Sequence, residues 1–146
     1  MKTDTPGTLL GFDFGMKRIG VAIGQTVTKT ARPLGIINAE QGVPQWDAFT
    51  RLLKTWQPDA LVVGIPLNMD GTEQPLTHHA RKFAAALSLR SGLKVYEMDE
   101  RLTSVEAKAR LFEAGGYKAL KNTPIDSVAA QLILQNWLSQ TPLNGT

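Results

Sequence analysis

The sequence contains no cysteine, only two histidines, and no hydrophobic run long enough to cross a membrane. The absence of cysteine excludes disulfide bonds, zinc sites built on thiolates and catalysis by a thiol. The longest apolar stretch, Leu61 to Leu67, is interrupted by Gly64 and Pro66 and falls far short of the ~20 residues that a spanning helix needs. The N-terminal residues also lack the apolar block of a secretory signal. We therefore expect a cytoplasmic protein with no membrane partner.

Two common functional signatures are missing as well. His78 and His79 are adjacent, so they lack the His-x-x-x-His spacing that places two metal ligands on one helix face. No Gly-x-x-x-x-Gly-Lys-Ser/Thr sequence is present, which excludes a P-loop nucleotide site. Charge is scarce near the C-terminus, where Asp126 is the only charged side chain after Lys121.

The composition is that of an ordinary globular domain. The 146 residues include 42% hydrophobic and 20% charged side chains, and the net charge is +3. This length supports one hydrophobic core, and we find no internal repeat or low-complexity linker. We expect a single domain over residues 1–146, with its core at 8–139. The small positive charge is compatible with a nucleic-acid partner but does not require one.

Hydrophobic periodicity divides the chain into strands and helices. The expected strands are 8–14, 19–24, 33–38, 60–64 and 93–98. The expected helices are 46–56, 76–87 closed by Gly92, a segment from the capping box at 103–106 to the glycines at 115–116, and a last helix that begins near 123. This order predicts an α/β fold with a five-stranded mixed sheet, three strands antiparallel and then two parallel, covered by helices. The inner face of the last helix is expected to carry Val128, Ala129, Leu132, Ile133 and Trp137.

Acidic residues occur where such a sheet places functional groups, at the carboxyl ends of its strands. Asp13 ends the first strand, and Asp99 and Glu100 follow the fifth. If these two strands are neighbours, their carboxyl ends meet, and the last helix can bring Asp126 beside them. Clustered carboxylates repel unless a cation neutralises them, and ligands that are all oxygens suit Mg²⁺ or Mn²⁺. Two such ions about 3.5–4 Å apart stabilise the attacking and leaving oxygens of phosphodiester hydrolysis.

Each acidic position also has an ordinary structural explanation. Asp13 precedes a glycine by two positions, a sequence that often only begins a turn. Asp99 and Glu100 could lie in a solvated loop, with Arg101 as a local ion-pair partner. Asp126 stands in the first turn of a helix, where a carboxylate interacts favourably with the helix dipole. Its isolation on a helix that is otherwise apolar argues for a further role.

Basic residues lie close to the acidic ones in the sequence. The candidates for contacts with a nucleic acid are Lys17, Arg18, Arg101, Lys118 and Lys121. The stretch 115–123 is glycine-rich and basic and contains Tyr117, a composition typical of a loop that meets a phosphate backbone and stacks on a base. An ordinary solvated connector is the alternative.

Four segments together resemble the YqgF/RuvX family, in order across residues 8–139. They are Leu10–Ala22 (LGFDFGMKRIGVA), Val63–Gly71 (VGIPLNMDG), Asp99–Ser104 (DERLTS) and Asp126–Ala130 (DSVAA). The resemblance implies an RNase H-like fold and a metal-dependent nuclease. It links the chain to Holliday junction resolution, through similarity to RuvC, and to maturation of small-subunit ribosomal RNA. It also implies an acidic triad at Asp13, Glu100 and Asp126, with Asp99 as the alternative to Glu100.

Three functions remain open from the sequence. The leading hypothesis is a Mg²⁺- or Mn²⁺-dependent endonuclease for structured nucleic acid, either pre-16S rRNA or a Holliday junction, and the latter would require a homodimer with paired sites. A second is a non-catalytic RNA-binding or ribosome-assembly module that uses the same basic surface. A third is an ATP-dependent phosphotransferase, because a similar Asp-x-Gly turn occurs in the actin, Hsp70 and sugar-kinase group. That group clamps its nucleotide between two domains, and this chain supplies only one.

Overall fold

Three antiparallel strands from the N-terminal part of the chain form one side of a mixed sheet. In the computed structural model, which describes residues 7–100 and 125–140, they are β1 (Thr8–Asp13), β2 (Arg18–Gln25) and β3 (Thr30–Glu40). A two-residue strand, β4 (Val43–Pro44), pairs with the end of β3. The sheet therefore has six strands rather than the predicted five. The sequence did not predict β4 because two residues are too few to produce a hydrophobic pattern.

Two further strands extend the sheet on the other side of β1. They are β5 (Ala60–Ile65) and β6 (Lys94–Asp99), and they run parallel to β1 in the order β4-β3-β2-β1-β5-β6. The crossovers contain α1 (Trp46–Trp56) and α2 (Pro75–Ser91), and α5 (Ile125–Gln140) follows later in the chain. The predicted α/β architecture with three antiparallel and two parallel strands is confirmed. The helix expected over 103–116 lies outside the described residues.

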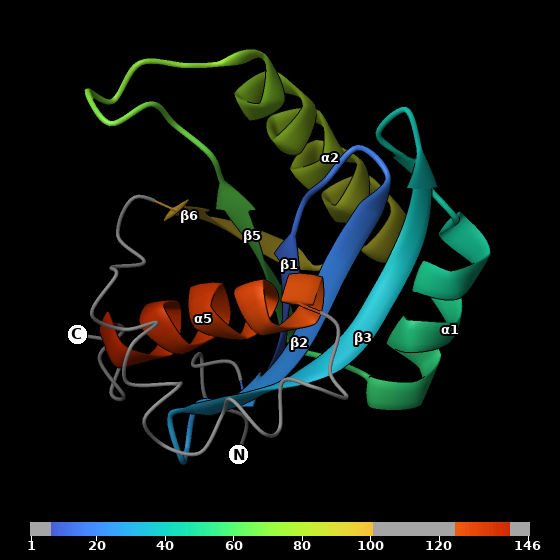
Figure 1. The fold of residues 1–146 in the computed structure, drawn as a ribbon. Helices are drawn as coiled ribbons and strands as arrows, with labels where there is room; N and C mark the ends of the chain where they lie inside the picture. Colours follow the sequence, from blue (N-terminus) through green and yellow to red (C-terminus); the bar gives the residue numbers. More distant parts are fainter. Residues whose placement is uncertain (1–6, 101–124, 141–146) are drawn as a thin grey trace.

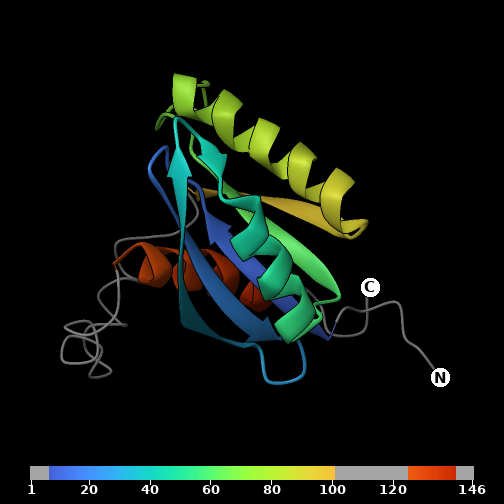
Figure 2. The same cartoon turned by 90° about the vertical axis from the view of Figure 1, so that its right-hand side faces the viewer.

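The helices cover both faces of the sheet (Figures 1 and 2). Helices α1 and α2 lie on one face, and α5 lies on the other. On the α1/α2 face, large aromatic side chains form the core. Phe12 is fully buried, and its ring centroid lies 5.8 Å from those of both Phe49 and Phe83. No helix in the described part of the chain is long and apolar enough to span a membrane.

On the α5 face, the strands present small residues instead. The glycines and alanines that face the helix are Gly11, Gly20, Ala22, Gly24, Ala60 and Gly64. A Cβ atom on Gly11 would lie 2.8 Å from the Cβ of Leu134, so a side chain there would force the helix outward. The absence of side chains lets α5 approach the sheet closely.

The inner face of α5 differs in part from the prediction. Val128 and Ile133 are buried as expected, but Ala129, Leu132 and Trp137 are only half-buried. The fully buried positions also include Ala130, Leu134 and Leu138. Because polar and apolar residues are spread around this helix, its hydrophobic period does not select one face. The face that packs on the sheet is instead the one whose side chains fit over the glycines of the strands.

Two glutamines of α5 bind the free edge of β3. The Gln135 side chain accepts a hydrogen bond from the Ala31 N–H at 3.0 Å and donates one to the Lys29 carbonyl at 2.6 Å. Gln131 donates to the Ala31 carbonyl at 3.0 Å. The helix thus satisfies backbone groups that a neighbouring strand would otherwise satisfy.

Candidate active site

Asp13 lies in the middle of a row that crosses three strands. Its Cα partners are Gly20 on β2 and Gly64 on β5. Side chains of paired residues project to the same face of a sheet, and those of one strand alternate between faces. Leu9 and Gly11 both contact the α5 side, so Asp13 faces α5 as well.

The first turn of α5 lies directly over Gly20. A Cβ atom on Gly20 would overlap the carbonyl oxygen of Asp126 and lie 2.9 Å from the Ser127 nitrogen. Ser127 is fully buried, so this turn is pressed against the sheet. Gly20 therefore allows the backbone of Asp126 to rest on the strand next to Asp13.

Glu100 occupies the equivalent position on the other side of Asp13. A Cβ atom on Gly64 would lie 2.7 Å from Glu100 Oε1 and 3.1 Å from its Cγ. The first and fifth predicted strands, which are β1 and β6, are not neighbours, because β5 lies between them. The missing side chain of Gly64 lets Glu100 lie over the intervening strand instead.

The strand register distinguishes Glu100 from Asp99. Asp99 pairs with Ile65, whose side chain is buried in the aromatic core on the α1/α2 face. Glu100 contacts Gly64, which belongs to the α5 face. Glu100, rather than Asp99, therefore shares a face with Asp13 and Asp126.

One of the predicted basic residues contacts this row, and another precedes it in the chain. Arg18 begins β2 two positions before Gly20, and its Nε donates to Asp126 Oδ2 at 3.3 Å. Lys17 is exposed in the preceding turn, where its carbonyl accepts a hydrogen bond from the Ala39 N–H at 2.8 Å. Arg101, Lys118 and Lys121 lie outside the described residues.

The donor set of the row fits a hard divalent cation. Its acidic side chains offer only carboxylate oxygens, which Mg²⁺ and Mn²⁺ prefer. Within residues 7–100 and 125–140, no three Asp, Glu, His or Cys side chains already converge tightly enough to hold an ion. The Asp126 carboxylate is directed to Arg18. The backbone thus places the acidic residues on one row, and binding an ion there requires rotation of side chains.

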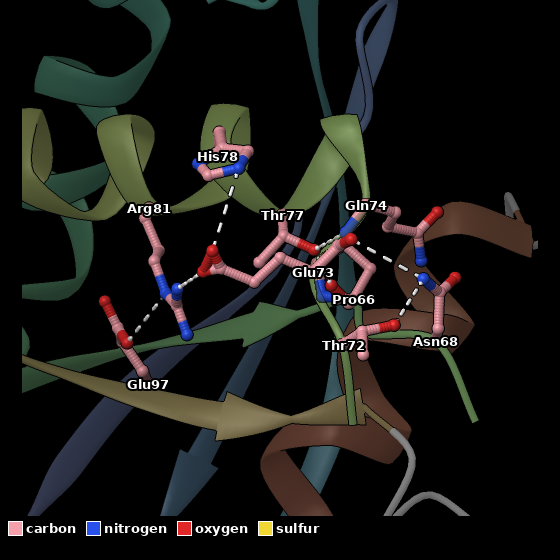
Figure 3. Close-up of polar contacts among 9 residues, drawn as sticks. All are labelled: Pro66, Asn68, Thr72, Glu73, Gln74, Thr77, His78, Arg81 and Glu97. Atoms are coloured by element: carbon pink, nitrogen blue, oxygen red, sulfur yellow. Dashed lines mark hydrogen bonds and ion pairs between the residues drawn. The ribbon is translucent and has the colours of Figure 1, made fainter. Parts of the chain in front are cut away.

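A structured loop borders the same edge of the sheet, at the carboxyl end of β5 (Figure 3). The fully buried Thr77 hydroxyl donates to the Pro66 carbonyl and accepts from the Gln74 N–H, which closes a capping box at the start of α2. Asn68 Nδ2 donates to Thr72 Oγ1 at 2.9 Å. Sequence reasoning assigned no role to this loop, although it belongs to one of the four family-like segments.

Sequence reasoning also gave no role to the glycines of the row. Gly20 and Gly64 lie within strands, where glycine weakens the strand and often marks the close approach of another backbone. The signal was present, because several glycines interrupt three strands that are otherwise hydrophobic.

The chain matches one family along nearly its whole length. The family model described as "RuvX: Holliday junction resolvase" matches residues 7–140. A "Putative pre-16S rRNA nuclease" of Escherichia coli O157:H7 (strain EC4115 / EHEC) is 58% identical over 134 residues, which are 92% of this chain and 97% of the relative. A protein of the same name from Shewanella oneidensis is 56% identical over 130 residues, 89% of this chain and 92% of the relative.

Solved structures share the fold at much lower identity. The structure described as "T. thermophilus RuvC in complex with Holliday junction substrate" superposes with a TM-score of 0.57 and 17% identity, covering 89% of this chain and 91% of that one. The yeast mitochondrial Holliday junction resolvase gives a TM-score of 0.56 at 11% identity, covering 89% of this chain and 77% of that one. This likeness establishes the RNase H-like fold.

Proposed function

Because this chain belongs to the RuvX family, we propose that it is an endonuclease that hydrolyses phosphodiester bonds in structured nucleic acid. Its close relatives are named for pre-16S rRNA, and the fold neighbour is bound to a Holliday junction. Pre-16S rRNA and a four-way DNA junction are therefore the substrates to compare. We propose that the domain over residues 1–146 performs the reaction, which takes place in the cytoplasm.

One observation carries this proposal: Glu100 and Asp126 lie over the two Cα partners of Asp13, all on one face of the sheet. We propose that Asp13, Glu100 and Asp126 hold one or two Mg²⁺ or Mn²⁺ ions. A divalent ion bound there supplies Lewis-acid stabilisation of the charge that develops on the phosphate oxygens. The carboxylates fix the position of this charge relative to the substrate.

The basic residues hold the substrate in this proposal. Arg18 lies at the edge of the row, and Lys17, Arg101, Lys118 and Lys121 are proposed as further phosphate contacts. Each phosphate that they neutralise makes binding more salt-dependent. Resolution of a four-way junction would also require a homodimer, because two strands must be cut at symmetric positions.

The test compares carboxylate variants with a matched neighbour. We expect Asp13→Asn, Glu100→Gln and Asp126→Asn each to lower the cleavage rate by at least about a hundredfold, since each removes a charged ligand of the ion that would stabilise the transition state. Asp99→Asn, which changes the adjacent residue on the other face, keeps the parent's rate. The measurement is Mg²⁺-dependent cleavage of labelled pre-16S rRNA and of a four-way junction, with substrate binding followed by fluorescence anisotropy.

Two outcomes would contradict the proposal. An Asp13→Asn variant that cleaves as fast as the parent, free of contaminating nuclease, would exclude the carboxylate mechanism. Failure of the parent to cleave either substrate, combined with loss of RNA binding on charge reversal at Lys118 and Lys121, would favour the non-catalytic binding module.

A further inference from the structure

The backbone places Arg18 and Asp126 beside each other, and their side chains form an ion pair. Arg18 pairs with Asn38 inside the sheet, and Gly20, two positions further along the same face, lies under the Asp126 backbone. The Arg18 guanidinium therefore stands beside the Asp126 carboxylate because of strand and helix placement. The Arg18 guanidinium thus supplies a positive charge at the Asp126 end of the acidic row.

This ion pair is easily broken. The Arg18 side chain is 56% exposed and that of Asp126 is 33% exposed, with 3.3 Å between Nε and Oδ2. Exposed pairs of this kind contribute only about 0–1 kcal/mol. A divalent ion that is also bound by Asp13 and Glu100 interacts with several carboxylates at once, so it can displace the guanidinium from Asp126.

The guanidinium and a divalent ion also repel each other, because both carry positive charge within a few ångströms of one carboxylate. Once released, Arg18 can offer its planar set of donors to a phosphate, which it binds better than a lysine would. We propose that Arg18 exchanges partners when the ion binds: it neutralises Asp126 in the ion-free protein and contacts the substrate phosphate in the loaded one. This inference rests on the proposed nuclease function.

Lys17 provides the matched comparison. It carries the same charge one position earlier and is exposed. Among the described residues it forms no ion pair, whereas Arg18 pairs with Asp126. A general effect of net charge on ion affinity would appear equally in variants of both residues.

The experiment measures Mn²⁺ affinity by electron paramagnetic resonance, without substrate. We expect Arg18→Gln to bind Mn²⁺ about two- to fivefold more tightly than the parent, the fold-change that corresponds to losing a weak competing pair. Arg18→Lys restores part of the competition, and Lys17→Gln leaves the affinity nearly unchanged. A ¹H–¹⁵N spectrum gives a second readout: the Arg18 Nε–H signal shifts on addition of Mg²⁺ in the parent but not in Asp126→Asn.

The outcomes separate this inference from the proposed function. If the parent binds no Mn²⁺, or if Asp13→Asn binds it equally well, both the metal site and the exchange of partners are wrong. If Asp13→Asn loses Mn²⁺ but Arg18→Gln binds it no more tightly than the parent, only the exchange is overturned. An equal gain in Lys17→Gln would likewise overturn it, because net charge would then explain the effect.

Discussion

The two faces of the sheet are built from side chains of opposite size. The α1/α2 face packs phenylalanine against phenylalanine, with the Phe12 ring in contact with those of Phe49 and Phe83. The α5 face offers glycine and alanine to a helix that lies close to the strands. Large buried side chains contribute most to stability, while small ones allow backbones to approach.

The residues that contribute most to stability and the residues of the candidate site therefore lie on opposite faces of the sheet. The acidic row belongs to the α5 face, and it forms because the chain lacks side chains at Gly20 and Gly64. The aromatic face lies behind the row and carries none of the three proposed ligands Asp13, Glu100 and Asp126. Substitutions on the two faces should therefore change different measurements.

The largest effect on stability is expected on the aromatic face. Phe12→Ala removes a fully buried ring that contacts two others, and it should lower the free energy of unfolding by about 3–5 kcal/mol. Urea unfolding measures this loss. At temperatures where the variant remains folded, Mn²⁺ affinity should stay near that of the parent, and a large loss would contradict the separation of the two faces.

A smaller loss of stability with a larger loss of function is expected at Gly20. In Gly20→Ala, the new methyl group meets the Asp126 carbonyl, so the start of α5 must move. We expect a cost of about 1–3 kcal/mol in unfolding free energy, typical of overpacking, together with loss of Mn²⁺ binding and cleavage.

Gly64→Ala provides a graded control for this variant. The atoms nearest to its new methyl group are the ends of the Ile133 and Glu100 side chains, which can rotate, whereas a helix backbone cannot. Its stability should fall less than that of Gly20→Ala. An unchanged Mn²⁺ affinity in Gly20→Ala would mean that the close approach of α5 does not position Asp126.

The smallest effect is expected on the surface of α2. Arg81 pairs with Glu73 and lies 3.8 Å from Glu97, and all three side chains are roughly half exposed (Figure 3). Arg81→Gln should lower the unfolding free energy by at most about 1 kcal/mol, and the difference should shrink at high salt. A cost as large as that of Gly20→Ala would show that polar contacts outside the aromatic core contribute substantially to this face.

Most of the fold could be predicted from the sequence because its apolar segments are clear. The short apolar runs of β1 and β2 and the helical spacing from Trp46 to Trp56 predict the correct elements. The two-residue strand β4 was missed because it has no period. The inner face of α5 was predicted only in part, because a helix without a distinct apolar face is oriented by the surface that it meets.

The candidate site depended on information that spacing does not contain. The sequence identified acidic residues at strand ends, but it could not choose between Asp99 and Glu100 without knowing which face α5 covers. It also made the meeting of the carboxylates conditional on the adjacency of two strands, and β5 separates those strands. The roles of Asp13, Glu100 and Asp126 as ligands stay predictions until ion binding is measured.

The hydrogen bonds of two α5 glutamines to β3 fix the helix to the sheet at a set distance from Asp126. Gln131 and Gln135 hold one part of α5 at Ala31, while Asp126 lies nine positions before Gln135, about 13 Å along the helix axis. One residue inserted between these points would leave the glutamines in place and rotate the first turn by about 100°. The number of residues between Asp126 and the two glutamines therefore sets the direction in which its carboxylate projects.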